Sequence, residues 1–199
     1  PTTRLAEVNA RKKFKQNFKK QKIQLKRLVF SDESWLCCND RTGRMQWVKK
    51  NAKPLPREKK ARWNVPSIMI WAAVGYNYKS ELVIFPAKKL DEDGEERSYR
   101  LNSFAYIRKC LSGVVPHLIK NNKVFIQDGA RSHASKETRL YLTGKGVQWI
   151  QDWPAYSPDL NMIETVWKLL NEELGRHSPL TMEELIAGTK QAWKDLSQA

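Results

Sequence analysis

Several features that often define a protein class are scarce in this chain of 199 residues. Its three cysteines, Cys37, Cys38 and Cys110, are too few for a disulfide framework and lack the spacing of a zinc site. Free thiols are typical of a reducing compartment. No apolar run approaches the roughly 18 residues that a membrane helix needs, and the polar, basic N-terminus lacks the apolar segment of a secretory signal. We therefore expect neither a membrane span nor a membrane partner.

Acidic residues are also in the minority, because 21 Asp and Glu stand against 36 Lys and Arg and leave a formal net charge of +15. The excess is concentrated in two blocks. Residues 1–27 hold ten basic residues and one acidic residue, and residues 49–62 hold seven basic residues and one acidic residue. Such charge can serve solubility or form a solvated helix face, but two concentrated blocks favour a polyanion bound through its phosphates. An anionic membrane is the weaker alternative, since the first block has few large apolar residues.

Nucleic acid is the polyanion that we expect, and DNA in particular once the motifs below are considered. The candidate contacts are basic side chains from both blocks. They are Arg11, Lys12 and Lys13 in the first block, and Lys49, Lys50, Lys53, Arg57, Lys59, Lys60 and Arg62 in the second.

The pattern of apolar residues predicts one α/β domain, in keeping with a chain length that can bury a sizeable core. Apolar runs predict strands, and apolar residues at helical spacing predict helices. The predicted strands are 27–31, 45–48, 67–75, 80–85, 124–127 and 147–150, and the predicted helices are 4–26, 102–118, 135–142, 162–176 and 181–197. The basic, proline-containing residues 49–66 are predicted to form a long loop. This order favours a mixed sheet with helices packed on its faces.

Two predicted strands lead into a carboxylate, Asp32 after the first and Asp128 after the fifth. If these strands are neighbours, the two acids lie close together and repel unless a cation neutralises them. Mg²⁺ suits such a site, because proteins hold it with one or two carboxylates, water and substrate phosphates. Glu164, in the first turn of a predicted helix, is a candidate third acid. Three carboxylates with two metal ions form the machinery of phosphoryl transfer, in which one ion activates the attacking oxygen and the other stabilises the leaving oxygen.

Each acid also has an ordinary structural interpretation. An Asp that follows a strand is often a turn or cap residue. With Asn161 as the N-cap of its helix, Glu164 occupies the third helical position, as the partner in a capping box does. The catalytic interpretation therefore depends on the three acids as a set.

Three sequence blocks resemble the signature blocks of mariner-superfamily DNA transposases, in the order in which that family has them. The blocks are SDES at 31–34, QDGARSH at 127–133 and WPAYSPDLNMIETVW at 153–167. In that family each block supplies one carboxylate of an Asp-Asp-Glu/Asp triad on a ribonuclease-H-like fold. The resemblance covers residues 28–178. It departs from the family at Gly129, where Asn is common, and at Met162, where Pro is common.

The resemblance implies that Asp32, Asp128 and Glu164 are the catalytic residues and the ligands of two Mg²⁺ or Mn²⁺ ions. It also implies a ribonuclease-H-like mixed five-stranded sheet flanked by α-helices. His133 matches the family's His after the second Asp, so it is expected either beside Asp128 or in a local hydrogen bond at a helix start. Asn161 is expected to support the same site.

The function implied by the resemblance is that of the catalytic domain of a cut-and-paste transposase. Such a domain hydrolyses phosphodiesters at transposon ends and joins the 3′-hydroxyl to target DNA at TA sites. The implied organisation is a basic N-terminal helix or linker at 1–27 and a catalytic domain at 28–199 with a clamp-like loop at 49–66, without the family's N-terminal helix-turn-helix region. We further expect a homodimer of the full-length protein, acting in the nucleus. Two alternatives remain open: another ribonuclease-H-like nuclease or integrase, and a non-catalytic DNA-binding protein derived from a transposase.

Overall fold

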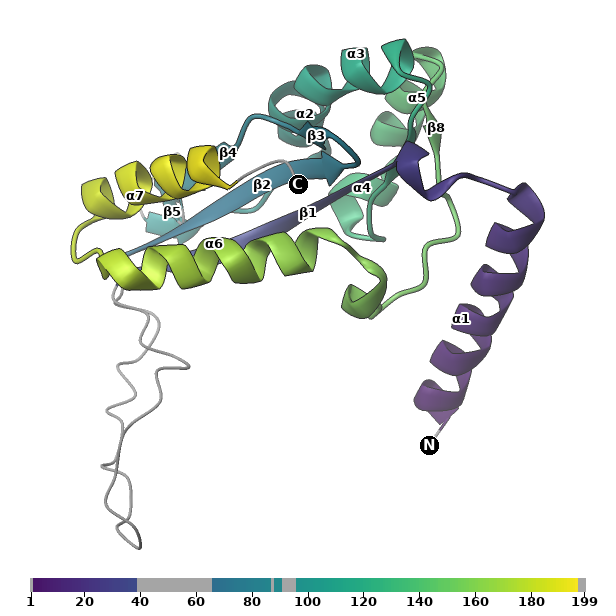
Figure 1. Ribbon diagram of the computed structural model, residues 1–199, viewed down its shortest axis with the longest axis horizontal. Coiled ribbons are helices and arrows are strands. Elements are labelled where there is room, and N and C mark those ends of the chain that lie inside the picture. Colours follow the sequence, from purple (N-terminus) through teal and green to yellow (C-terminus); the bar gives the residue numbers. More distant parts are fainter. Residues whose placement is uncertain (1, 39–65, 87, 91–95, 197–199) are drawn as a thin grey trace, which may run out of the picture.

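A computed structural model describes residues 2–38, 66–86, 88–90 and 96–196 (Figure 1). The predicted strand at 45–48 and nearly all of the predicted loop at 49–66 lie outside the described residues. The strands are β1 (Leu28–Cys37), β2 (Ser67–Gly75), β3 (Tyr78–Lys79), β4 (Val83–Pro86), β5 (Lys88–Leu90), β6 (Glu96–Ser98), β7 (Val124–Ile126) and β8 (Gln148–Trp149). The helices are α1 (Thr2–Gln21), α2 (Ser103–Tyr106), α3 (Ser112–Lys120), α4 (Arg131–Ala134), α5 (Lys136–Gly144), α6 (Ile163–His177) and α7 (Met182–Asp195). A π-helical turn at Ile107–Leu111 joins α2 to α3, and 3₁₀ turns occupy Leu25–Arg27 and Pro158–Leu160.

The main sheet is mixed, with the strand order β3-β2-β1-β7-β8 and with β4 also paired to β2. β2 runs antiparallel to β1, β3 and β4, whereas β7 runs parallel to β1 and β8. β3 and β4 pair with opposite ends of β2 and so share one position in the sheet. Between them the Ser80 amide donates to the Ala73 carbonyl, and the Ser80 hydroxyl accepts from the Ala73 amide, each at 2.9 Å. The predicted mixed sheet flanked by helices is confirmed. Its five positions hold six strands, because one position is interrupted at Ser80.

Each face of the sheet has its own hydrophobic core, because successive strand residues point to opposite sides. On β2, Trp71 and Ala73 belong to the core under α2, α3 and α5, while Ile70 and Ala72 belong to the core under α6 and α7. Buried apolar residues of these helices complete the two cores. They are Tyr106, Val114, Leu118 and Leu142 on the first face, and Ile163, Trp167, Leu170, Leu174, Leu185 and Trp193 on the second.

Strand β1 continues well beyond residue 31, where the sequence pattern predicted its end. It pairs with β2 without interruption from Val29, opposite Gly75, to Cys37, opposite Ser67. The prediction that Asp32 follows the end of its strand is therefore wrong, because Asp32 lies in the middle of β1. The polar residues of the SDES block conceal the strand, since they interrupt the apolar run by which a buried strand is predicted.

A third hydrophobic cluster attaches α1 to the sheet at the β1–β7 end. Its members come from β1, β7, α1, the segment that follows α1 and the chain after β8. They are the buried Leu28, Val124, Ile126 and Ile150, with the half-buried Phe14, Phe18, Ile23, Phe30 and Trp153 packed against them. Beyond this attachment α1 extends away from the body, with the N-terminus at its far end (Figure 1). Within the described ranges, no helix has both the length and the apolar character that crossing a membrane requires.

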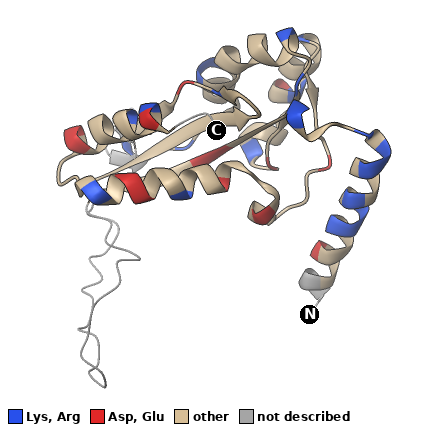
Figure 2. Ribbon diagram, viewed as in Figure 1, with Lys and Arg blue, Asp and Glu red and all other residues tan. Residues whose placement is uncertain are grey.

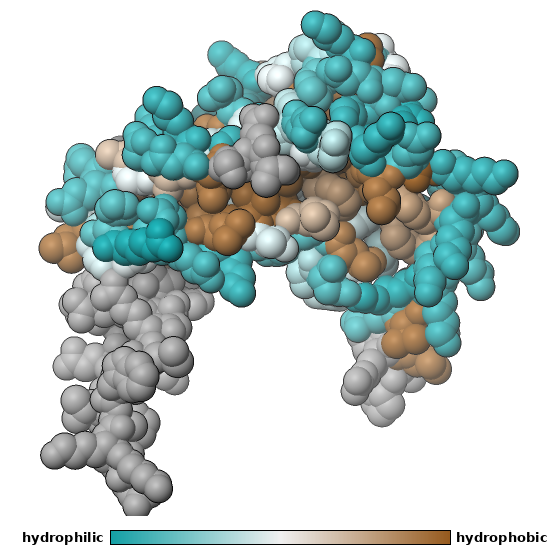
Figure 3. Space-filling model, viewed as in Figure 1, coloured by the Kyte–Doolittle hydropathy of each residue, from teal (hydrophilic) through white to brown (hydrophobic). Residues whose placement is uncertain are grey.

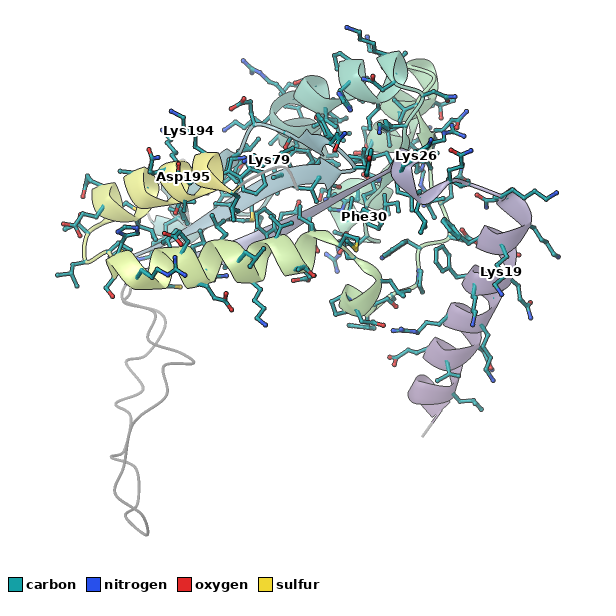
Figure 4. The ribbon with its side chains drawn as sticks, in the orientation of Figure 1. Lys19, Lys26, Phe30, Lys79, Lys194 and Asp195 are labelled. Carbon is teal, nitrogen blue, oxygen red and sulfur yellow. The ribbon has the colours of Figure 1, made fainter. Side chains whose placement is uncertain are left out.

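The C-terminal end of α7 is held by a lysine of β3 (Figure 4). The Lys79 ammonium donates to the carbonyl oxygens of Trp193 at 2.6 Å and of Leu196 at 2.5 Å. These carbonyls lie at a helix end, where they have no partner within the helix. Lys79 therefore joins the outer edge of the sheet to the helix that closes the second core.

Candidate active site

The two aspartates are brought together by the parallel pairing of β1 and β7. In this pairing Leu28 lies opposite Val124, and Phe30 lies opposite Ile126. β7 ends at Ile126, but the same register continued by two residues places Asp32 opposite Asp128. On the other side of β1, Asp32 pairs with Ala72 of β2, whose small side chain leaves room beside the carboxylate. The predicted convergence of these two acids therefore follows from the observed strand pairing.

The Asp32 carboxylate is half-buried and accepts two hydrogen bonds. Its Oδ1 accepts from the Glu33 amide at 2.8 Å, and its Oδ2 accepts from Nδ2 of Asn161 at 3.1 Å. Burial, and then the charges of Glu33, Asp128 and Glu164, raise the pKa of Asp32 to about 7, against the lowering effect of the Glu33 amide. The charged form of Asp32 is thus costly in the absence of a compensating cation.

Asp128 has the opposite electrostatic character. Its Oδ1 accepts from the Ala130 amide at 2.9 Å and lies 2.6 Å from Nδ1 of His133. Burial alone would raise the pKa of Asp128, but the hydrogen bonds from His133 and Ala130 outweigh it and lower the pKa below the ordinary value. Asp128 is therefore a stable anion beside an aspartate that resists ionisation.

His133 links Asp128 to a fourth acid, Glu33. The His133 side chain is only 1% exposed, and its Nε2 lies 3.0 Å from Oε1 of Glu33. Because both ring nitrogens face carboxylates, both donate, and the imidazole is positively charged. Burial would lower the pKa of His133, but the bonds to Asp128 and Glu33 raise it to about 9. Of the two expected positions, His133 thus occupies the one beside Asp128.

Glu33 is a residue of the site that the sequence analysis missed. It follows Asp32 in β1, so the two side chains point to opposite faces of the sheet. Asp32 faces α6, and Glu33 faces α4 and the His133 ring. The second acid of the SDES block was the available signal, although nothing local identified His133 as its partner.

The His133 ring is held in place by two further polar residues that the sequence analysis did not identify. The Tyr106 ring lies against it, with 4.2 Å between ring centroids. The Tyr106 hydroxyl donates to Oε1 of Gln127 at 2.8 Å, and Nε2 of Gln127 donates to the His133 carbonyl at 3.2 Å. All three side chains are buried, so the imidazole that orients Asp128 is itself packed and hydrogen-bonded.

Asn161 supports the site from the opposite face, and the prediction that it caps α6 is wrong. α6 begins at Ile163, Met162 already has helical backbone angles, and no side chain caps this end. The side chain of Asn161 instead bonds Asp32. Its Nδ2 group, and not its Oδ1, faces the carboxylate, because an oxygen in that place would repel it. Its own Oδ1 is buried and has no hydrogen-bond partner in the part of the chain that the structure describes.

Glu164 occupies the first turn of α6, with its backbone amide donating to the Asn161 carbonyl at 3.1 Å. The residue is exposed, and its charge reaches Asp32, whose pKa it helps to raise. Because Asn161 bonds Asp32 instead of capping the helix, the capping-box interpretation of Glu164 is also wrong. The third acid is therefore an exposed neighbour of Asp32.

The chemistry of these donors fits a hard divalent cation. Asp32, Asp128 and Glu164 offer only oxygen ligands, as Mg²⁺ and Mn²⁺ prefer, and a cation beside Asp32 would offset the repulsion that raises its pKa. Across the described residues, no group of three or more His, Cys, Asp and Glu side chains already has the arrangement of a metal-ligand set. The three acids thus have the ligand type that such an ion prefers and lie near one another, but their oxygen atoms do not converge on a common point in this structure.

The predicted DNA contacts fall in different places. Lys12 and Lys13 are exposed on α1, which carries basic residues along its length, while acidic residues mark the middle of β1 (Figure 2). The outward surface of α1 is hydrophilic except near its N-terminal end, where Leu5 and Val8 are exposed (Figure 3). Arg11 is bonded to Asp159. The seven candidates between residues 49 and 62 lie outside the described residues.

The fold and the paired acids are those of a nuclease-type catalytic domain, and the comparisons with known proteins identify its family. Residues 27–186 match the family described as DDE superfamily endonuclease. The chain belongs to this family, and the predicted relationship to mariner-superfamily transposases is confirmed.

Two nematode transposases are similar in sequence. The Tc3 transposase of Caenorhabditis elegans is 28% identical over 173 residues, which cover 85% of this chain and 49% of the relative. The Tc1 transposase of the same organism is 35% identical over 71 residues, which cover 36% of this chain and 26% of the relative. The chain thus spans about half the length of Tc3 transposase and less of Tc1 transposase.

Solved structures of Mos1 transposase share the fold. The catalytic domain of Mos1 mariner transposase matches with a TM-score of 0.62 and 16% identity, covering 97% of this chain and 81% of that one. The Mos1 paired-end complex with the left transposon end matches with a TM-score of 0.67 and 15% identity, covering 96% of this chain and 55% of that one. The predicted ribonuclease-H-like α/β class is thereby confirmed.

Proposed function

We propose that this chain is the catalytic domain of a cut-and-paste DNA transposase. The observation that carries the proposal is the placement of Asp32 on β1 beside Asp128, which follows the parallel strand β7 by two residues, with both Asp128 and Glu164 close enough to raise the pKa of Asp32. Membership in the endonuclease family and the similarity to Tc3 and Tc1 transposases support it. The reaction is phosphodiester hydrolysis at transposon ends followed by transfer of the 3′-hydroxyl into target DNA, at TA sites.

Asp32, Asp128 and Glu164 would hold two Mg²⁺ or Mn²⁺ ions. When bound, such ions supply activation of the attacking oxygen and stabilisation of the leaving oxygen. The chain's own groups orient the acids. His133 and the Ala130 amide hold Oδ1 of Asp128 and leave Oδ2 without a hydrogen bond among the described residues. Asn161 holds Oδ2 of Asp32 on the opposite face of the sheet.

The basic blocks would bind the DNA backbone at transposon ends and target. Lys12 and Lys13 on α1 are exposed and form no ion pair with an acid within the described residues, and the block at 49–62 adds seven positive charges. Charge of this density favours phosphate contacts that weaken steeply with salt. We propose that the full-length protein acts as a homodimer in the nucleus.

The test is a cleavage and strand-transfer assay on labelled transposon-end duplexes with Mg²⁺ or Mn²⁺. Asp128→Ala should lose cleavage and joining, whereas Glu172→Gln, an exposed change farther along α6, should retain both. If Asp128→Ala cleaves and joins as well as the wild type, the role assigned to the acids is wrong. Cleavage of an RNA–DNA hybrid without any joining would favour the alternative of another ribonuclease-H-like nuclease.

A further inference from the structure

Helix α1 is bonded to the loop that leads into the active site. The Arg11 guanidinium donates through Nη1 to Oδ1 of Asp159 at 2.9 Å and through Nη2 to Oδ2 of the same carboxylate. Nη1 also reaches the Ser157 hydroxyl at 3.3 Å. Six residues farther along α1, Nδ2 of Asn17 donates to the Asp152 carboxylate at 3.0 Å. The helix therefore contacts both ends of residues 152–159.

Aromatic packing lies between these two polar contacts. The Phe14 ring meets Trp153 edge to face, with 5.3 Å between centroids, and Phe30 of β1 meets the same indole at 6.4 Å. Trp153 thus joins α1 to the strand that carries Asp32. Figure 4 shows Phe30 on β1, between the body of the sheet and α1.

The loop held by α1 ends at the residues that complete the site. Asp159 lies in a 3₁₀ turn, Pro158–Leu160. The backbone amide of Asn161 donates to the Pro158 carbonyl at 2.9 Å, and the backbone amide of Glu164 donates to the backbone carbonyl of Asn161 at 3.1 Å. Since the Asn161 side chain bonds Asp32, a displacement of this turn would be transmitted to the support of Asp32 and to the start of α6.

We propose that α1 is a positioning arm of the active site, in which Arg11, through Asp159, fixes the turn that places Asn161 and Glu164. The inference rests on the proposed function and gives Arg11 a role other than the predicted phosphate contact. A bidentate guanidinium–carboxylate pair defines direction as well as distance, which suits a positioning role. Lys12, the next residue of α1, is exposed. DNA bound to α1 through Lys12 would hold the helix against residues 152–159.

Hydrogen exchange measured by mass spectrometry tests this without DNA or metal. Four variants are compared with the wild type: Arg11→Glu, Asp159→Arg, the double exchange of both charges, and Lys12→Glu, which makes the same charge change one residue away. Peptides that cover 152–165 report the loop, and peptides that cover β2 report global stability. Because the pair is partly exposed, we expect exchange in the loop to accelerate about three- to tenfold in each single reversal.

The double exchange should return the loop to within about twofold of the wild-type rate, and Lys12→Glu should leave it unchanged. The proposal is overturned if Arg11→Glu leaves the loop unchanged relative to β2, or if the double exchange protects it no better than the single reversals. In the cleavage assay, Arg11→Glu should lower turnover more than DNA affinity, whereas Lys12→Glu should lower affinity more than turnover. An effect of Arg11→Glu on affinity alone also contradicts the proposal. Failure of the wild type to cleave DNA would refute the proposed function and leave the exchange result standing.

Discussion

Replacement of His133 by glutamine should remove a pH-dependent part of the stability of the domain. The imidazole is buried between Asp128 and Glu33, at 2.6 and 3.0 Å, and carries a positive charge. Glutamine retains a polar side chain but cannot become charged, so it leaves two carboxylates without their shared cation. The same change should weaken the hold on Oδ1 of Asp128.

The magnitude follows from the pKa of the imidazole. Each pKa unit corresponds to about 1.4 kcal/mol, so the rise from 6.5 to about 9 corresponds to about 3 kcal/mol of folding stability. A base whose pKa is raised in the folded state binds its proton more tightly there. The stabilisation is therefore complete below about pH 6.5 and is lost as the pH rises through about 9.

Urea unfolding of the wild type and His133→Gln at about pH 6 and about pH 9.5, with a chelator present, measures this contribution. The difference in unfolding free energy between the two proteins should be about 3 kcal/mol larger at the lower pH, because groups common to both proteins cancel. His177→Gln is the matched control for the loss of an exposed imidazole, since His177 is 66% exposed. An equal difference at both pH values for His133→Gln would refute a charged imidazole between the two acids.

Three further predictions concern the surroundings of the aspartates. Burial and neighbouring acids raise the pKa of Asp32 to about 7, so protons compete with a metal ion for this carboxylate. The affinity for Mn²⁺, measured by calorimetry, should therefore rise with pH up to about 7 and then level off. An affinity that does not change below pH 7 would contradict this. Asn161→Ala removes a hydrogen bond to Asp32 and should lower the unfolding free energy by about 1–2 kcal/mol. The loss should be larger at about pH 8 than at about pH 5, because Asp32 is charged at the higher pH. An equal loss at both pH values would disprove the contact. Gly129→Asn should change the unfolding free energy by less than about 0.5 kcal/mol, since no described residue other than its two chain neighbours lies within 4 Å of a Cβ at that position. A loss of about 2 kcal/mol would show that the space is not open.

The acids are the part of the site that could be predicted from sequence. Asp32, Asp128 and Glu164 lie in blocks whose order and composition are characteristic, and neighbouring strands were a sufficient hypothesis to bring the aspartates together. The length of β1 could not be predicted, because the polar residues required by the site interrupt the pattern that reveals a strand. The same conflict explains Asn161. Asn is a favourable N-cap residue, so the local sequence predicted that Asn161 caps α6. The helix begins later, at Ile163, and the Asn161 side chain bonds Asp32.

Contacts between distant segments were beyond sequence reasoning. Glu33 meets His133 across 100 positions, and Arg11 meets Asp159 across 148. No local pattern identifies such partners, because they depend on how the strands and loops pack. Arg11 was grouped with the DNA contacts for this reason: composition reports the charge of a segment, whereas only the fold shows which charge is already paired.

In the proposed function, Asp32, Asp128 and Glu164 act together as a metal centre for DNA cleavage. A Mn²⁺ titration followed by electron paramagnetic resonance, with a transposon-end duplex present, tests it most directly. The wild type and Glu172→Gln should each bind about two ions, and Asp128→Asn and Glu164→Gln should bind fewer. If the wild type binds no Mn²⁺ at millimolar concentration even with DNA, or if Asp128→Asn binds as many ions as the wild type, the three acids are not the metal centre proposed for them.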